Sequence, residues 1–305
     1  MTSKPMLAGF FFAITATILW SGNFIVARGL SAEIAPLSLA FWRWVVAILV
    51  LLPFAIKPVL QQWSWVKEHF AYLCIVSLLG VTLFNSLIYY AGQTSSAINL
   101  SLIAITFPIF ILLLSRIFLS QAIGWNKLVG IVLVAAGILI LISKGKVFVL
   151  AELTTAQGDI WMLFASLIFA IYSMLLKRKP AGIGVVPFQW LSFILGLIML
   201  LPFYLLERYT LPATEFSAST IMSIIYIGVF ASLLAFILWN KAIAIIGAVN
   251  AGMVYYSLPI FSGILAIIIL DESFSRLHLY SMLLVLAGIV LAVVYNPRKM
   301  PVNRK

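Results

Sequence analysis

The chain has 305 residues, of which 64% are hydrophobic and only 9% are charged, and its formal net charge is +11. A soluble globule of this length needs far more polar surface, so the composition excludes a soluble fold and indicates an all-α membrane protein. The single cysteine, Cys74, excludes an intramolecular disulfide. We find no metal-ligand cluster, nucleotide-binding loop or nucleophile–base arrangement, so neither a metal, a cofactor nor an enzyme is predicted.

Ten apolar segments are each long enough to cross a bilayer as a helix, for which about 18 residues suffice. In the first half they cover roughly residues 7–27, 36–56, 70–91, 96–119 and 127–143, and in the second half roughly residues 158–176, 185–206, 219–240, 248–270 and 277–295. The first segment lacks a cleavage pattern, and we interpret it as a retained span rather than a secretory signal.

The first span carries polar groups that are costly in hydrocarbon. Trp20 and Asn23 lie within one helical turn, and Tyr172 stands at the equivalent place of the sixth span. Such residues usually face a cavity or a neighbouring helix. We interpret all three as lining a substrate cavity; hydrogen bonding between helices is the alternative.

Arg43, in the second span, is a charge well inside an apolar stretch, between Trp42 and Trp44. A buried guanidinium needs a partner, and none of the eight acids is placed at its depth by the sequence. Arg43 is therefore a candidate ligand for a substrate carboxylate. The alternative is that its side chain extends to the outer headgroups and stacks on its tryptophans.

Aromatic residues close the third and eighth spans. Tyr89 precedes a short hairpin at 91–96, and Trp239 precedes another at 241–247. Rings at such turns are typical of an interfacial belt. Because the two hairpins are predicted to face opposite sides of the membrane, these rings are also candidates for two gates.

The fourth and ninth spans share an asparagine near the start and a proline nine residues later. These are Asn99 with Pro108 and Asn250 with Pro259. Proline removes a backbone hydrogen bond and bends a helix, so we predict paired hinges, with fixed packing kinks as the alternative. Asn99 and Asn250 are candidates to hydrogen-bond a substrate, and Tyr256, which shares a helix face with Asn250, is a further candidate for ligand contact.

The two halves of the chain repeat each other at a spacing of about 150 residues. Leu51-Leu52-Pro53-Phe54 recurs as Leu200-Leu201-Pro202-Phe203, and Ala136-Gly137-Ile138 recurs as Ala287-Gly288-Ile289. Because five spans is an odd number, the second copy must start on the opposite side of the membrane. The sequence thus predicts ten transmembrane helices as two inverted five-helix repeats, residues 1–148 and 149–305, a ground plan of secondary transporters.

Basic residues predict the orientation. Thirteen of the 19 Lys and Arg residues fall on the side that holds both termini, and five fall on the other side. Since basic loops stay in the cytoplasm, we expect both termini to be cytoplasmic. The basic tail lacks interleaved aromatic residues, so no nucleic-acid partner is predicted.

On these residues the chain resembles the drug/metabolite transporter superfamily, in its ten-span branch of EamA-like permeases. The resemblance covers residues from about Leu7 to Tyr295 and rests on Trp20 to Phe24, Arg43, Asn99 to Pro108, and Leu270-Asp271-Glu272. It implies a central cavity lined by spans 1, 3, 4, 6, 8 and 9, with the 3–4 and 8–9 helix pairs as moving gates. The family typically has Glu near the end of the fourth span, where this chain has Gln121.

These observations predict a secondary transporter in the inner (plasma) membrane that moves a small metabolite by alternating access, in the direction of export. The expected substrate is an amino acid or an aromatic or cationic amphipathic compound, and the expected partners are this small-molecule substrate and the lipid bilayer. We favour a monomer and gradient-driven movement. Proton antiport through Asp159, with Lys241 as its cationic counterpart, and a channel are the alternatives.

Overall fold

The computed structural model describes residues 4–119, 124–145, 157–176, 178–211 and 216–291, apart from the side chains at 4, 119, 247–250 and 253. Every regular element among these residues is helical. The elements are α1 (Lys4–Gly29), α2 (Pro36–Gln61), α3 (Trp63–Glu68), α4 (Phe70–Ser77), the π-helix η1 (Leu78–Leu83), α5 (Phe84–Thr94), α6 (Ala97–Ala104), α7 (Phe107–Leu119), α8 (Trp125–Ile142), α9 (Gln157–Leu176), α10 (Val185–Thr210), α11 (Ala218–Ile225), the π-helix η3 (Tyr226–Leu234), α12 (Ala235–Tyr255), α13 (Leu258–Leu270) and α14 (Arg276–Ile289).

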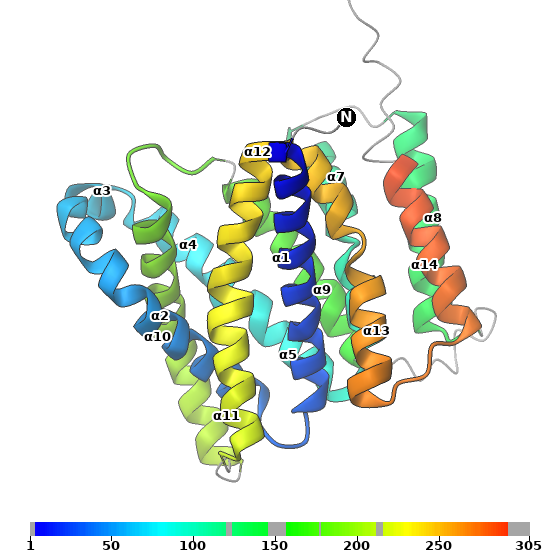
Figure 1. The fold of residues 1–305 in the computed structure, drawn as a ribbon, viewed down its shortest axis with the longest axis horizontal. Helices are drawn as coiled ribbons and strands as arrows, with labels where there is room; N and C mark the ends of the chain where they lie inside the picture. Colours follow the sequence, from blue (N-terminus) through cyan, green and yellow to red (C-terminus); the bar gives the residue numbers. More distant parts are fainter. Residues whose placement is uncertain (1–3, 120–123, 146–156, 177, 212–215, 292–305) are drawn as a thin grey trace, which may run out of the picture.

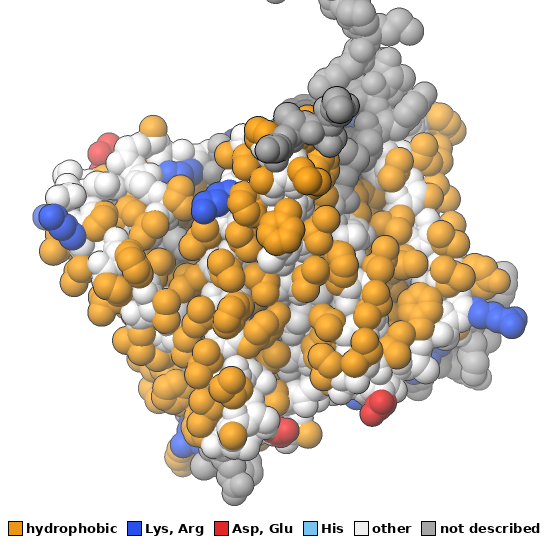
Figure 2. Space-filling model, viewed as in Figure 1, with side chains coloured by type: hydrophobic (Ala, Val, Ile, Leu, Met, Phe, Trp, Pro, Cys, Tyr) orange, Lys and Arg blue, Asp and Glu red, His pale blue; other side chains and the backbone are white. Residues whose placement is uncertain are grey.

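Eight stretches of helix in the described chain are long and apolar enough to cross a membrane, and α13 and α14 are shorter apolar helices. The outer surface agrees with this, because Figure 2 shows hydrophobic side chains across the middle of one face and charged ones gathered toward its margins. The predicted class, an all-α membrane protein, is confirmed. The count of ten spans stays a prediction, since the last two helices fall below the length of a full crossing.

The prolines of the fourth and ninth spans lie just after breaks in the helix. α6 ends at Ala104 and α7 begins at Phe107, so Pro108 is in the first turn of a new helix. Likewise α12 ends at Tyr255, and Pro259 is in the first turn of α13. A proline is tolerated in a first turn because the N–H it lacks would have no helical acceptor there.

The prediction of a hairpin at 241–247 is wrong, because the helix is not broken there. Backbone hydrogen bonding in α12 is continuous from Ala235 to Tyr255. No proline lies in this stretch, so nothing there removes a backbone donor. The other hairpin is shorter than expected: α5 continues to Thr94, and only Ser95 and Ser96 separate it from α6.

Many of the helix pairs that pack together take one helix from each half of the chain. α1 packs against α12, while its counterpart α9 packs against α5, the counterpart of α12. α2 packs against α10 and α8 against α14, so each of these helices meets its own counterpart, while α6 packs against α13, which is the counterpart of α7. α1 begins and α14 ends at the same end of the bundle, the upper one in Figure 1. This pairing is the one that a two-fold relation between the halves produces.

Two π-helical segments occupy equivalent positions in the halves. η1 lies in the third span and η3 in the eighth, about 150 residues apart. Their widened turns leave carbonyl groups for other donors: the Trp44 indole donates to the Val81 carbonyl at 3.2 Å, and the Trp20 indole to the Ala231 carbonyl at 3.1 Å. π-Bulges of this kind are frequent at functional sites.

Candidate functional site: a buried arginine between the two halves

Arg43 lies at the centre of a buried polar cluster rather than at the headgroups. Its side chain is 4% exposed. Nη1 lies 2.9 Å from Asn23 Oδ1, 2.6 Å from Asn85 Oδ1 and 2.8 Å from the Tyr89 hydroxyl, and Nε donates to Ser232 Oγ at 2.7 Å. Extension to the headgroups is therefore wrong. The predicted stacking is present, with the guanidinium carbon 4.9 Å from the centre of the Trp44 ring.

The acceptors around Arg43 come from three helical elements and from both halves. Asn23 belongs to α1, Asn85 and Tyr89 to α5, and Ser232 to η3. Asn85 Nδ2 also donates to the carbonyl of Gly80 in η1 at 3.2 Å, and Ser232 Oγ donates to the carbonyl of Ile227 at 2.8 Å. Each of these bonds reaches back five residues, which is the spacing of a π-helical turn. Arg43 thereby joins the two π-helical segments.

The charge of Arg43 is solvated by neutral groups alone. All of its recorded hydrogen-bond acceptors in the described chain are amide or hydroxyl oxygens. Burying an unpaired charge costs several kcal/mol even after relaxation, and each hydrogen bond to a charged group returns about 1.5–3 kcal/mol. The cluster tolerates the guanidinium but leaves it attractive to an anionic group.

A continuous chain of aromatic rings runs beside this cluster. Ring centres are 5.8 Å apart for Tyr172 and Phe169, 5.2 Å for Phe169 and Phe107, and 5.7 Å for Phe107 and Tyr255. Tyr255 then contacts Trp20 at 5.8 Å and Trp239 at 5.9 Å. Edge-to-face and tilted pairs at such distances are favourable.

The predicted site residues therefore fall into three groups. Asn23, Arg43 and Tyr89 form the polar cluster, whereas Trp20, Tyr172 and Trp239 belong to the aromatic chain. Asn99 lies apart from both, beside a pocket at one end of the bundle. Tyr89 is 1% exposed and lies more than a turn before the end of α5, so its predicted place at the mouth is wrong.

Two predicted site residues of the second half remain, Tyr256 and Asn250. Tyr256 follows the end of α12 and is half-buried against the main core, while its neighbour Tyr255 makes the contacts with the tryptophans. Asn250 is helical in α12, but its side chain lies outside the described residues.

Sequence reasoning missed Asn85, Ser232, Phe107 and Phe169. Asn85 could have been found, because an amide inside an apolar span is as costly as that of Asn23. Ser232 and the two phenylalanines have no such signal, since a serine bonds its own helix and phenylalanines are common on lipid-facing surfaces. The π-helical segments that bring Asn85 and Ser232 to Arg43 have no recognised sequence pattern.

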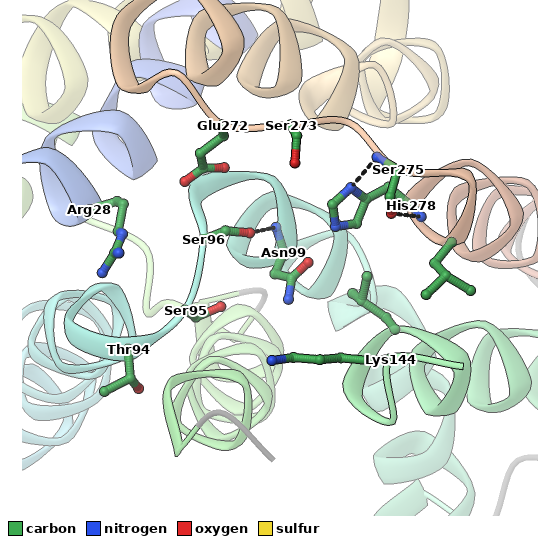
Figure 3. A pocket seen from close by; sticks show the side chains of 12 residues that line it. Arg28, Thr94, Ser95, Ser96, Asn99, Lys144, Glu272, Ser273, Ser275 and His278 are labelled. Carbon is green, nitrogen blue, oxygen red and sulfur yellow. Dashed lines mark hydrogen bonds between the residues drawn. The ribbon is translucent and has the colours of Figure 1, made fainter. Parts of the chain in front are cut away.

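The pocket near Asn99 has a volume of about 450 Å³, and the helix ends that line it lie at the lower end of the bundle in Figure 1. Figure 3 shows its polar side chains converging from the ends of α1 and α5, the start of α6, the end of α8 and the segment between α13 and α14. Beside it, Asp159 is 1% exposed and accepts hydrogen bonds from Ser95 and from Asn99 Nδ2.

The structure is a polytopic helical bundle that buries a polar cluster and an aromatic chain between its halves. Such an interior is typical of a membrane permease. The EamA-like transporter family matches the chain twice, over residues 7–143 and 156–294. The chain therefore belongs to the EamA-like transporter family and is a multi-pass membrane transporter, not an enzyme.

Similar proteins agree with this assignment. An uncharacterized transporter of Archaeoglobus fulgidus is 26% identical over 282 residues, which is 90% of this chain and 93% of that protein. Protein PecM of Dickeya dadantii is 23% identical over 284 residues, 92% of this chain and 90% of PecM. A solved crystal structure shares the fold with a TM-score of 0.59 at 19% identity, covering 96% of this chain and 98% of that one.

Proposed function

We propose that the protein is an alternating-access exporter of a small amphipathic metabolite, whose anionic group is recognised by Arg43. The observation that carries the proposal is a guanidinium buried between the halves with only neutral acceptors. A transported carboxylate supplies the missing counter-charge, and the polar cluster keeps Arg43 hydrogen-bonded when the site is empty. The aromatic chain offers ring faces to an apolar or cationic part of the same compound.

The gating elements are the helix pairs that contain the breaks. α6 and α7 are separated at 105–106, and α12 and α13 at 256–257, so each pair has a point where the helix can change direction. We take the halves 1–148 and 149–305 as inverted units, with both termini in the cytoplasm. The pairing of counterpart helices supports this arrangement.

Gradient-driven movement is the favoured energetics. The recorded acceptors of Arg43 in the described chain are amide and hydroxyl oxygens, so the cluster around it offers no carboxylate to carry a proton during transport. Proton antiport is the second candidate, because Asp159 is a buried carboxylate beside the pocket. Lys241, the other titratable candidate, is exposed and lies 6.0 Å from the ring of Phe12.

The experiment is counterflow of labelled amino acids and aromatic amines into proteoliposomes, with and without an imposed pH gradient. We expect saturable exchange without a gradient, and at least a tenfold loss of exchange in Arg43→Gln. Arg116→Gln, which alters an exposed arginine at the end of α7, is the control and should behave as the wild type. Exchange that needs a pH gradient favours the antiporter, and normal exchange in Arg43→Gln contradicts the proposed role of Arg43.

A further inference from the structure

We infer that the 450 Å³ pocket at the end of the bundle is a second ligand site, one that takes a small zwitterion whose ammonium and carboxylate lie on the same or neighbouring carbon atoms. The inference rests on the proposed function only in taking this ligand to be the transported compound on the outer side. The pocket lies beyond Arg43: Asn23 and Arg28 are five residues apart on α1, as are Tyr89 and Thr94 on α5, which is about 7.5 Å along each helix.

Asn99 provides an acceptor that has no donor. Its Nδ2 donates to both oxygens of Asp159 at 3.4 Å, which fixes the orientation of the amide because the reversed one would set two acceptors against each other. Oδ1 is then buried without a hydrogen bond among the described residues. In Figure 3 this oxygen is turned toward the side of the pocket where His278 lies. An ammonium or amine N–H is the group it needs.

Lys144 and His278 provide donors. Lys144 Nζ makes no hydrogen bond within the described part of the chain, and the residue is held at φ 50°, a left-handed conformation that glycine or asparagine adopts at lower cost. His278 Nδ1 accepts from the backbone N–H of Ser275 at 3.0 Å, so in the neutral ring Nε2 carries the proton. Both donors suit a carboxylate.

The other charges of the pocket are already balanced. Arg28 donates to the carbonyls of Gly92 and Gln93, and Glu272 accepts from the backbone N–H groups of Ala97 and Ile98 at the start of α6. Arg28 and Lys144 are cationic and Glu272 and Asp159 anionic, so the surroundings are formally neutral. A ligand with a net charge gains nothing from such a site, whereas one that carries both charges meets a partner for each.

The test is a thermal-shift screen of the full-length protein in lipid nanodiscs against each of the twenty common amino acids. For the amino acid that binds best, its amide, its deaminated acid and its N-trimethyl derivative are then titrated. We expect at least one amino acid to raise Tm in proportion to its affinity, and each derivative to bind at least tenfold more weakly. The N-trimethyl derivative keeps both charges but has no N–H for Asn99. No binding by any amino acid, or equal binding of a derivative, overturns the inference.

Two variants locate the binding. Lys144→Asn keeps a residue that tolerates the left-handed backbone, and Asn99→Leu removes the unpaired oxygen; both should weaken binding at least tenfold. Lys67→Asn, on an exposed lysine of α3, is the control and should bind as the wild type does. Undiminished binding in both pocket variants contradicts the site.

Arg43→Gln separates this inference from the proposed function. If both are right, Arg43→Gln loses exchange but still binds the zwitterion. Binding that depends on Lys144 in a protein that exchanges nothing would overturn the transport proposal alone. Undiminished binding in Lys144→Asn and Asn99→Leu, in a protein whose exchange depends on Arg43, would overturn the second site alone.

Discussion

At the scale of single residues, Arg43 sets the polarity of the interior. Its guanidinium hydrogen-bonds to two amides and two hydroxyls, which come from both halves of the chain and lie in an otherwise apolar region. The sequence indicates that Arg43 is unusual, but it is equally compatible with a side chain that extends to the headgroups, because a sequence does not show which side of a helix faces lipid. The structure distinguishes the two, since Arg43 and its hydrogen-bond acceptors are buried.

Close packing of Gly22 against Tyr226 gives the first prediction. A Cβ at position 22 would lie 2.1 Å from the Tyr226 hydroxyl, which donates to the carbonyl of Leu19 at 2.8 Å. Gly22→Ala therefore displaces this ring and should lower the stability by about 2 kcal/mol, within the range for overpacked cores. Thermal unfolding in detergent measures the loss. Adding Tyr226→Phe should recover part of it, and a double variant less stable than Gly22→Ala would contradict the steric cause.

Glu207 gives the second prediction. This carboxylate is 6% exposed and accepts from the backbone N–H groups of Leu37 and Ser38 at the start of α2. It satisfies donors that the helix itself cannot, and it interacts favourably with the helix dipole. Glu207→Ala should cost about 2–3 kcal/mol in thermal unfolding. Glu33→Ala, which removes a partly exposed acceptor of Thr220, is the comparison and should cost clearly less.

At the scale of elements, the helix breaks beside the prolines give the third prediction. Pro108→Ala and Pro259→Ala restore a backbone donor near each break, which favours a continuous helix. We expect both variants to keep the wild-type Tm to within a few degrees and to exchange substrate several-fold more slowly in proteoliposomes. Pro202→Ala, inside the continuous helix α10, is the control and should exchange normally. Unchanged exchange in both hinge variants would show fixed kinks.

Much of the element order could be predicted from sequence. Runs of apolar residues between charges and turns located the eight long helices, since bilayer thickness sets their length. The errors concern features that hydropathy does not encode. The stretch 241–247 contains a lysine and a glycine, which suggested a turn, yet α12 is continuous there; and π-helical turns differ from α-helical ones by a hydrogen-bond shift that leaves composition unchanged.

The candidate site was only partly predictable for the same reason. Asn23 and Arg43 stand out because polar groups in hydrocarbon are rare, and the structure places them in contact. Tyr172 and Trp239 were expected near them, but they lie in an aromatic chain that Phe107 and Phe169 complete. Which aromatic residues meet depends on helix packing, and the sequence specifies that only through many weak contacts.

At the scale of the whole molecule, the two ends of the bundle differ. The end where α5 meets α6 carries the open pocket. Toward the opposite end, α1 and α12 close on each other through a cluster in which Ala13 and Ala242 are fully buried. In the proposed topology the pocket lies on the outer side, and we expect transport to require the pocket to close as the α1–α12 contact opens.

Cysteine accessibility from each side of the membrane tests this account most directly. In a Cys74→Ser background, Ser273→Cys reports on the pocket and Ala13→Cys on the closed end. Membrane-impermeant thiol reagents are added to right-side-out and inside-out vesicles, with and without transported substrate. We predict that substrate lowers the reactivity of the cysteine at 273 from outside and raises that of the cysteine at 13 from inside, in the same proportion. High reactivity of both at once, or no reciprocal change, would contradict alternating access through one pathway between the two halves.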